Sequence, residues 1–93
     1  LILYLYYMDI NQLIEIVKTK IENEIVCDEI KIIDKTISHK NHASHQKGKF
    51  HLQIIIQSDE LRSMSKLDSF RKVHKVLDID LKRHIHSLQL KII

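Results

Sequence analysis

Apolar residues in the first third of the chain recur at the spacing of a helix that buries one face. They lie three or four positions apart over residues 10–25. Asp9 is a good N-cap, and Gln12 three positions later completes the pattern of a capping box. We therefore expect a helix over residues 10–25.

A second helical pattern occupies the latter half of the chain. Ser65 is a suitable N-cap, and apolar residues follow at helical spacing from Leu67 onward. His74 lies on this apolar stripe, so we expect it in the core or at its boundary. Asp78 and Asp80 lie late in this pattern, where the helix dipole disfavours negative charge. We therefore expect the helix to loosen or end near them.

Three short segments have the patterns of strands. Residues 30–33 are mostly isoleucine, and residues 52–57 and 88–92 alternate apolar with polar side chains. The order is helix, strand, strand, helix, strand. A helical crossover favours parallel pairing of the last two strands, and a loop allows antiparallel pairing of the first two. The chain is predicted to be an α+β domain with a KH-like α-β-β-α-β order, a three-stranded mixed sheet and both helices packed on one face.

A long polar segment, residues 35–49, separates the first two strands. It contains His39, His42, His45 and the only glycine, Gly48. Long loops in small domains are often functional, and closely spaced imidazoles bind zinc, copper or iron. One interpretation is therefore a metal-binding loop. If the loop histidines act without other ligands, they would hold a single metal ion. The other interpretation is a solvated polar loop.

His86 stands at the start of the last predicted strand. Strict alternation places it on the face of Leu88, Leu90 and Ile92, at the rim of the core. A histidine at a rim can keep one ring nitrogen accessible while packing fixes the ring, as a metal ligand requires. The alternative interpretation is a half-buried structural histidine.

Composition limits the class of protein. A chain of 93 residues with 44% hydrophobic and 29% charged residues, no proline and one glycine is expected to fold as one small domain. The single cysteine, Cys27, cannot form an internal disulfide, and its apolar flank indicates an inert structural thiol in a reducing, cytoplasmic setting. Phosphate-binding glycine loops and nucleophile elbows are absent from the sequence, which argues against an enzyme.

The first eight residues are apolar and aromatic and carry no charge. They are far shorter than the roughly 20 residues of a membrane span, so we expect no membrane association. They also lack the basic start and the cleavage site of a signal peptide. We expect a domain over residues 9–93, with residues 1–8 as an apolar extension and Met8 as the native start.

Charge is unevenly distributed along the chain. Residues 1–38 carry a net charge of −3 and residues 39–93 a net charge of +6. The second helix and its flank could therefore lie along nucleic-acid phosphates, although the glycine-containing clamp of KH modules and a set of stacking aromatics are missing. The candidate contacts are Lys66, Arg71, Lys72, Lys75, Lys82 and Arg83. An ordinary solvated face is the alternative.

Four motifs together resemble the BolA family. They are IDKTISHKNHA at residues 33–43, GKFHL at 48–52, QSDEL at 57–61 and IHSL at 85–88. The match extends from about Leu13 to the end of the chain. One departure is in the second helix, where the family commonly has Arg-His-Arg and only Arg71 corresponds.

The resemblance implies a non-enzymatic adaptor in iron-sulfur cluster trafficking or iron regulation. Members of the family bind monothiol glutaredoxins and share a glutathione-bound 2Fe-2S cluster with them, and some are described as DNA-binding regulators. His86 matches the family's cluster-ligating histidine, and the second ligand would be His39 or His42 from the loop. The partner's cysteine and glutathione would complete the site. Which glutaredoxin binds, whether the chain binds DNA and whether it dimerises when free stay open.

Overall fold

A computed structural model of the chain describes residues 8–36 and 49–93, and its first element is the helix α2 (Ile10–Glu24). The carboxylate of Asp9 accepts a hydrogen bond from the Asn11 N–H at 2.7 Å, and the Gln12 side chain accepts one from the Asp9 N–H at 3.2 Å. The predicted capping box is therefore formed. The buried face of the helix consists of Leu13, Val17 and Ile21.

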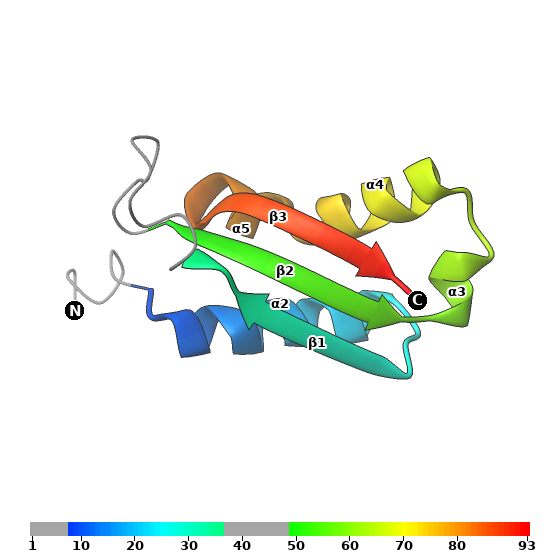
Figure 1. Cartoon of the computed structure of the whole chain (residues 1–93), viewed down its shortest axis with the longest axis horizontal. Helices are drawn as coiled ribbons and strands as arrows, with labels where there is room; N and C mark the ends of the chain where they lie inside the picture. Colours follow the sequence, from blue (N-terminus) through cyan, green and yellow to red (C-terminus); the bar gives the residue numbers. More distant parts are fainter. Residues whose placement is uncertain (1–7, 37–48) are drawn as a thin grey trace.

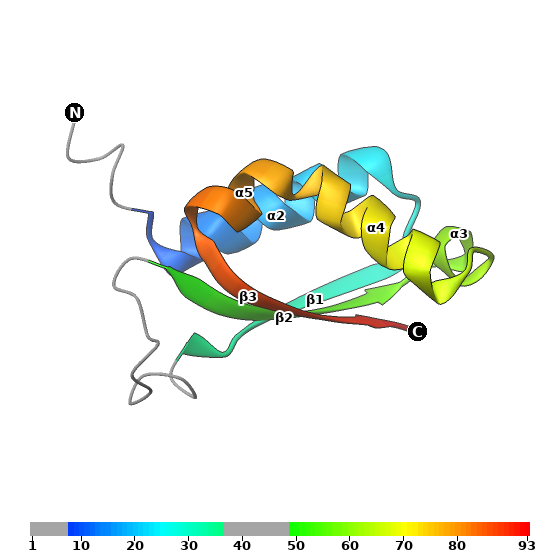
Figure 2. The same cartoon turned by 90° about the horizontal axis from the view of Figure 1, so that it is seen from above.

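The sheet has the predicted topology. Its strands are β1 (Glu29–Asp34), β2 (Phe50–Gln57) and β3 (Ile85–Ile92), in the order β1-β2-β3. β1 is antiparallel to β2 and β3 is parallel to it. Figure 1 shows the sheet in front of the helices, and Figure 2 shows that they cover the same face of it. The expectation of a mixed α+β domain with its helices on one face is confirmed.

A short helix, α3 (Asp59–Arg62), follows β2, and the sequence patterns did not predict it. Ser58 begins it, because its hydroxyl accepts the Leu61 N–H at 3.1 Å. The same hydroxyl donates to the Val26 carbonyl at 2.7 Å, in the turn between α2 and β1. Ser58 is fully buried, so one side chain fixes the end of the sheet against that turn.

The second predicted helix is divided into α4 (Lys66–Val76) and α5 (Asp78–Arg83). Ser65 caps α4 as expected, by accepting the Asp68 N–H at 3.1 Å. The predicted break lies at Leu77, so Asp78 and Asp80 begin a new helix, where the dipole favours negative charge. Asp80 is buried and pairs with Lys20 of α2 at 2.7 Å, which ties the two helices together.

The buried face of α4 differs from the predicted stripe. It consists of Ser69 and Val73 and continues to Leu77, whereas Leu67 is 59% exposed. His74 is exposed, with Nδ1 at 2.7 Å from the Phe70 carbonyl oxygen, so its predicted place in the core or at its boundary is wrong. The reason is Ser69: its hydroxyl donates to the Lys66 carbonyl at 2.8 Å, and this satisfied polar group is able to face the core.

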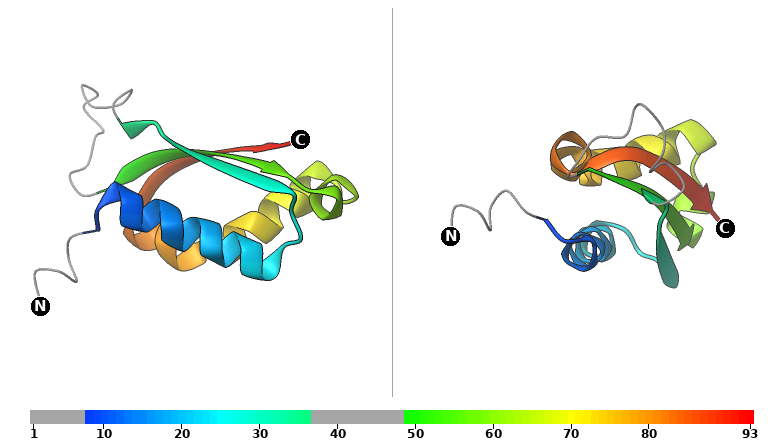
Figure 3. Two further views of the ribbon diagram at one scale, coloured as in Figure 1. Left: turned by 90° about the horizontal axis from the view of Figure 1, so that it is seen from below. Right: turned by 60° about the vertical axis from the view of Figure 1, so that its left-hand side comes forward.

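Figure 3 shows α2 alongside α4 and α5 on one face of the sheet, and one hydrophobic cluster lies between the sheet and these helices. α2, at 15 residues the longest helix of the described ranges, is too short to cross a membrane, and no other helix there is long and apolar enough. Met8 packs against the edge of the cluster. The buried members are Leu13, Val17, Ile21, Ile25, Leu52, Ile54, Ile56, Leu61, Val73, Leu77 and Ile85.

Candidate functional site

The parallel pairing of β2 and β3 is irregular at its start. Phe50 is opposite Ile85, but the next residue, His51, is opposite Ser87. His86 is therefore an extra residue in β3, as in a β-bulge, and bulges redirect side chains. The backbone is anchored there by a hydrogen bond of 2.8 Å from the Phe50 N–H to the His84 carbonyl.

The bulge changes the face on which His86 lies. Leu88, Leu90 and Ile92 are paired with buried residues of β2 and face the helices. His86 is exposed and lies against His51, whose alternation in β2 directs it away from the helices. The sequence predicted that His86 shares the face of Leu88, Leu90 and Ile92 and lies at the rim of the core. That prediction is wrong, because strict alternation takes no account of the extra residue in β3.

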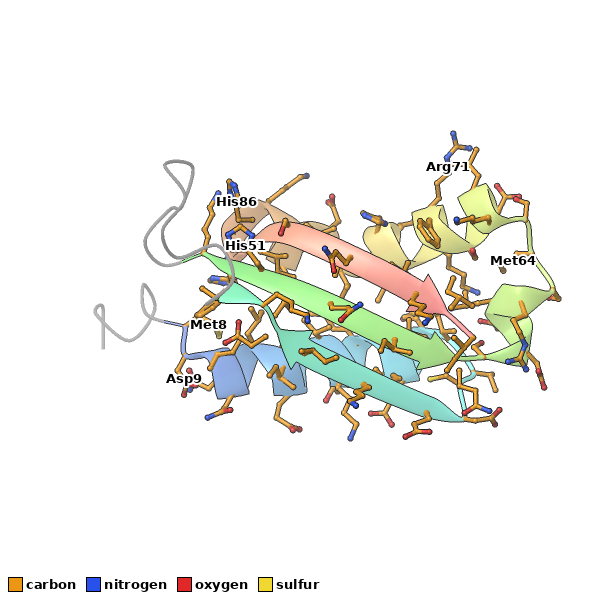
Figure 4. The ribbon with its side chains drawn as sticks, viewed as in Figure 1. Met8, Asp9, His51, Met64, Arg71 and His86 are labelled. Carbon is orange, nitrogen blue, oxygen red and sulfur yellow. The ribbon has the colours of Figure 1, made fainter. Side chains whose placement is uncertain are left out.

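His51 supports the ring of His86. It is 3% exposed, and its Nδ1 lies 2.7 Å from the Ser87 hydroxyl, so hydrogen bonding and burial both hold its ring. The centroids of the two imidazoles are 5.0 Å apart with an angle of 69° between the planes, an edge-to-face contact. Figure 4 shows the two rings side by side where β2 and β3 begin. His86 thus combines an exposed imidazole with a restricted orientation.

This geometry suits a metal ligand. A neutral imidazole ligates iron, zinc or copper through one nitrogen, and a neighbouring group that fixes the ring strengthens it as a ligand. In residues 8–36 and 49–93 no three His, Cys, Asp or Glu side chains are close enough together to hold a metal ion. A metal ion at His86 would therefore take other ligands from outside these ranges.

The loop histidines His39, His42 and His45 lie outside the described residues, as do residues 1–7. The polar segment that contains these histidines, residues 35–49, ends one position before Phe50 and two before His51 in the sequence. Sequence patterns alone did not single out His51 as part of the site. A usable signal was that each of two parallel neighbouring strands has a histidine as its second residue, since such strands start at the same edge of a sheet.

None of the six basic residues proposed for nucleic acid is buried. Two of them are paired with acids: Lys72 with Glu60 at 3.2 Å and Lys82 with Asp78 at 3.1 Å. Lys66 lies over the Phe70 ring, with its Nζ 5.7 Å from the centroid. The other three, without an ion pair in the described part of the chain, are Arg71, Lys75 and Arg83.

A groove of about 660 Å³ lies between α2 and α4 and includes part of this basic set. Four bases and two acids line it, so its charge is mixed rather than uniformly positive. The bases are Lys20, Arg71, Lys72 and Lys75, and the acids are Glu24 and Asp68.

Cys27, between α2 and β1, is half-buried and packs against the core. Its Sγ lies 3.5 Å from the Ile25 carbonyl oxygen, to which the thiol donates. Burial raises the pKa of the thiol, and the negative charges of Glu22, Asp28 and Glu60 raise it further. The protonated form is thereby favoured, which agrees with a structural role.

Comparison with known proteins identifies the family. The family model for BolA-like proteins matches residues 21–93, which include both strands of the histidine pair. The chain belongs to the BolA-like family. None of the curated proteins compared with it matches.

Solved structures agree with this assignment. The BolA domain of SufE1 from Arabidopsis thaliana is 26% identical, with a TM-score of 0.67 over 84% of this chain and 86% of that one. BolA1 from the same plant is 22% identical, with a TM-score of 0.70 and the same coverage. A bol-like protein from Babesia bovis is 16% identical, with a TM-score of 0.65 over 85% of this chain and 80% of the other. The last two likenesses establish the fold.

Proposed function

We propose that this BolA-like protein is a non-enzymatic adaptor that binds a monothiol glutaredoxin and shares a glutathione-bound 2Fe-2S cluster with it. His86 supplies one ligand, and His39 or His42 supplies the second. The partner's cysteine and glutathione supply the thiolates, which fits a chain with a single, half-buried cysteine. The role is iron-sulfur cluster trafficking or iron regulation.

The observation that carries the proposal is the environment of His86. The family resemblance singles out this histidine, and the bulge makes its imidazole exposed while His51 restricts the ring. The residues fit the group, because imidazole replaces thiolate as an iron ligand in known 2Fe-2S centres and raises the potential of the cluster there. The chain's own contribution is to present that imidazole at a fixed edge of the sheet.

Co-purification with a monothiol glutaredoxin under anaerobic conditions, with glutathione and iron, tests the assignment. The complex should show the visible absorption and circular dichroism of a 2Fe-2S cluster. His86→Ala should change both spectra, because one iron loses its imidazole ligand. His74→Ala is the matched control, since His74 is also exposed but lies on α4.

The two variants separate the possible outcomes. Spectra unchanged by His86→Ala would rule out this residue as a ligand. Equal changes in both variants would point to a general effect of losing a histidine. His39→Ala and His42→Ala, measured in the same way, should differ, and the one with the larger change identifies the loop ligand.

A nucleic-acid-binding regulator is the second candidate. It is favoured by Arg71, Lys75 and Arg83, which are exposed and have no ion pair in the described residues. Binding to duplex DNA should weaken steeply with salt and should weaken in Arg71→Ala, because each phosphate contact releases counterions. His86→Ala should leave this binding unchanged, which distinguishes it from the cluster function.

A further inference from the structure

The C-terminal half of β3 forms a surface that the proposed cluster site does not use. In the described part of the chain β3 is at the edge of the sheet, since the strand order is β1-β2-β3. Figure 4 places Met64, next to this surface, at the opposite end of the molecule from His86. An inference about this surface is therefore independent of the cluster proposal.

A groove of about 410 Å³ runs between this edge and α4. Leu90 and Ile92 of β3 form one wall, and Leu61, Met64 and Phe70 contribute apolar surface from the helical side. All but Leu61 are incompletely buried. The groove thus offers apolar contacts directly beside the edge of β3 that pairs with no strand of the described residues.

The charged residues that line the groove are all basic: Arg62, Lys66 and Lys91. Arg62 is paired with Asp59, but Lys66 and Lys91 have no ion pair in the described ranges. No aspartate or glutamate lines the groove. Its charge therefore complements an acidic ligand.

Backbone N–H and C=O groups at this edge of β3 also point away from β2, where an added strand could pair with them. Ile93 donates its N–H to the Ile56 carbonyl at 2.9 Å and accepts from the Ser58 N–H at 3.4 Å, so both of its groups face β2. Backbone groups of successive residues in a parallel strand turn to opposite sides. Ile92 and, two residues earlier, Leu90 therefore direct their N–H and C=O groups to the free edge.

We propose that this edge and groove bind an extended, acidic segment of a partner protein, in which apolar residues alternate with aspartate or glutamate. The segment adds to the sheet as a strand beside β3 and pairs with the backbone of Leu90 and Ile92. Its apolar side chains enter the groove on the side of the helices, and its carboxylates approach Lys91, which lies opposite Ile55 on the other face of the sheet. Alternation gives both contacts at once, because side chains of a strand point to opposite faces.

A second copy of the chain fits the edge less well. Pairing of two β3 edges would bring the Lys66 and Lys91 side chains of both copies toward one another, and like charges across paired strands are destabilising. The surplus of basic residues instead favours a partner of opposite charge.

The test uses the full chain and a fluorescein-labelled peptide in which valine alternates with glutamate, and binding is measured by fluorescence anisotropy. The wild-type protein should bind the peptide. Lys91→Glu should weaken binding roughly fivefold, as expected for replacing one exposed ion pair by a like-charge contact. Lys31→Glu is the matched control, because Lys31 of β1 and Lys91 of β3 are both exposed and both lie opposite Ile55, at the two edges of the sheet.

A second peptide, N-methylated on alternate residues so that it cannot donate to β3, tests the strand pairing. It should not bind. Equal binding of the methylated peptide, no binding of the first peptide by the wild type, or equal losses in Lys31→Glu and Lys91→Glu would each overturn the proposal. A wild-type chain that sediments as a dimer and binds neither peptide would assign the edge to a second copy, which also overturns it.

Discussion

The histidines of the described residues differ in what surrounds their rings. His74 is exposed on α4 and hydrogen-bonded to its own helix, and His84 is half-buried at the end of α5. His51 is buried and hydrogen-bonded to the Ser87 hydroxyl, and the exposed ring of His86 packs against it edge-to-face. Side chains of one type thus acquire different chemistry from their immediate neighbours, and only His86 is both exposed and supported by another imidazole.

Ser87→Ala should loosen this arrangement. The substitution removes the hydrogen-bond partner of His51 Nδ1 and is expected to lower the free energy of unfolding by about 1 kcal/mol. The contact between the His51 and His86 rings should weaken, which NMR measures as a smaller cross-relaxation between their protons. Gln89→Ala, the next exposed position on the same strand face, should change neither quantity. Unaltered ring contacts in Ser87→Ala would show that the hydroxyl does not orient His51.

Cys27 should react slowly with iodoacetamide. Its raised pKa leaves a smaller thiolate fraction at neutral pH than an ordinary cysteine has, and the thiolate is the reactive form. The alkylation rate of the native protein should therefore rise with pH along a curve displaced to higher pH than that of the urea-unfolded chain. Glu22→Gln should move the native curve part of the way back, because one neighbouring negative charge is lost. Identical curves for native and unfolded protein would contradict this account.

At the scale of elements, short-range features decide where one segment stops and the next begins. Leu77 separates α4 from α5, the extra residue His86 shifts β3 by one position, and Ser58 ends β2 and begins α3. Each of these positions fixes the direction of the element that follows. The position of Ser58 is the most connected, because its hydroxyl bonds both Leu61 and the Val26 carbonyl.

Ser58→Ala should destabilise the protein by about 2 kcal/mol, since it removes the cap of α3 and also the hydrogen bond from the buried Ser58 hydroxyl to the Val26 carbonyl. Ser65→Ala is the control: it removes the same kind of cap from α4 at an exposed position and should cost about 1 kcal/mol. Urea unfolding followed by circular dichroism measures both. Equal costs would mean that the bond to the Val26 carbonyl contributes nothing.

At the scale of the whole molecule, β2 is the centre of the structure. It pairs with β1 on one side and β3 on the other, and Leu52, Ile54 and Ile56 direct their side chains into the cluster beneath the helices. The outer strands have one free edge each in the described residues. Protection of the backbone N–H groups from hydrogen exchange should therefore be greatest in β2 and should alternate from residue to residue along β3.

Amide hydrogen exchange tests this expectation. The N–H groups of Ile54 and Ile55 should exchange slowest, because each faces a neighbouring strand. In β3, Leu90 and Ile92 should exchange roughly tenfold or more faster than Lys91, since their N–H groups face the free edge. Saturation with the alternating acidic peptide should slow Leu90 and Ile92 specifically. Uniform exchange along β3 would contradict the deduced edge.

Much of the fold follows from local patterns. The capping box at Asp9, the helical spacing after it and the alternation in β2 predicted their elements correctly, because burial of one face imposes a period of about 3.6 on helices and 2 on strands. The crossover between the last two strands predicted their parallel pairing. The short helix α3 was missed, since four residues provide no period, and its cap depends on a serine held by the distant Val26 carbonyl.

The sequence by itself determined the order of the main helices and strands, the mixed sheet and the family resemblance, and it proposed His86 among the seven histidines. The tertiary structure decided the face on which His86 lies, its contact with His51, the exposure of His74 and the basic groove beside β3. The physical reason is the range of the interactions. Periodicity and capping act within a few residues, whereas a bulge, a ring contact or a groove depends on the register between strands distant in the chain.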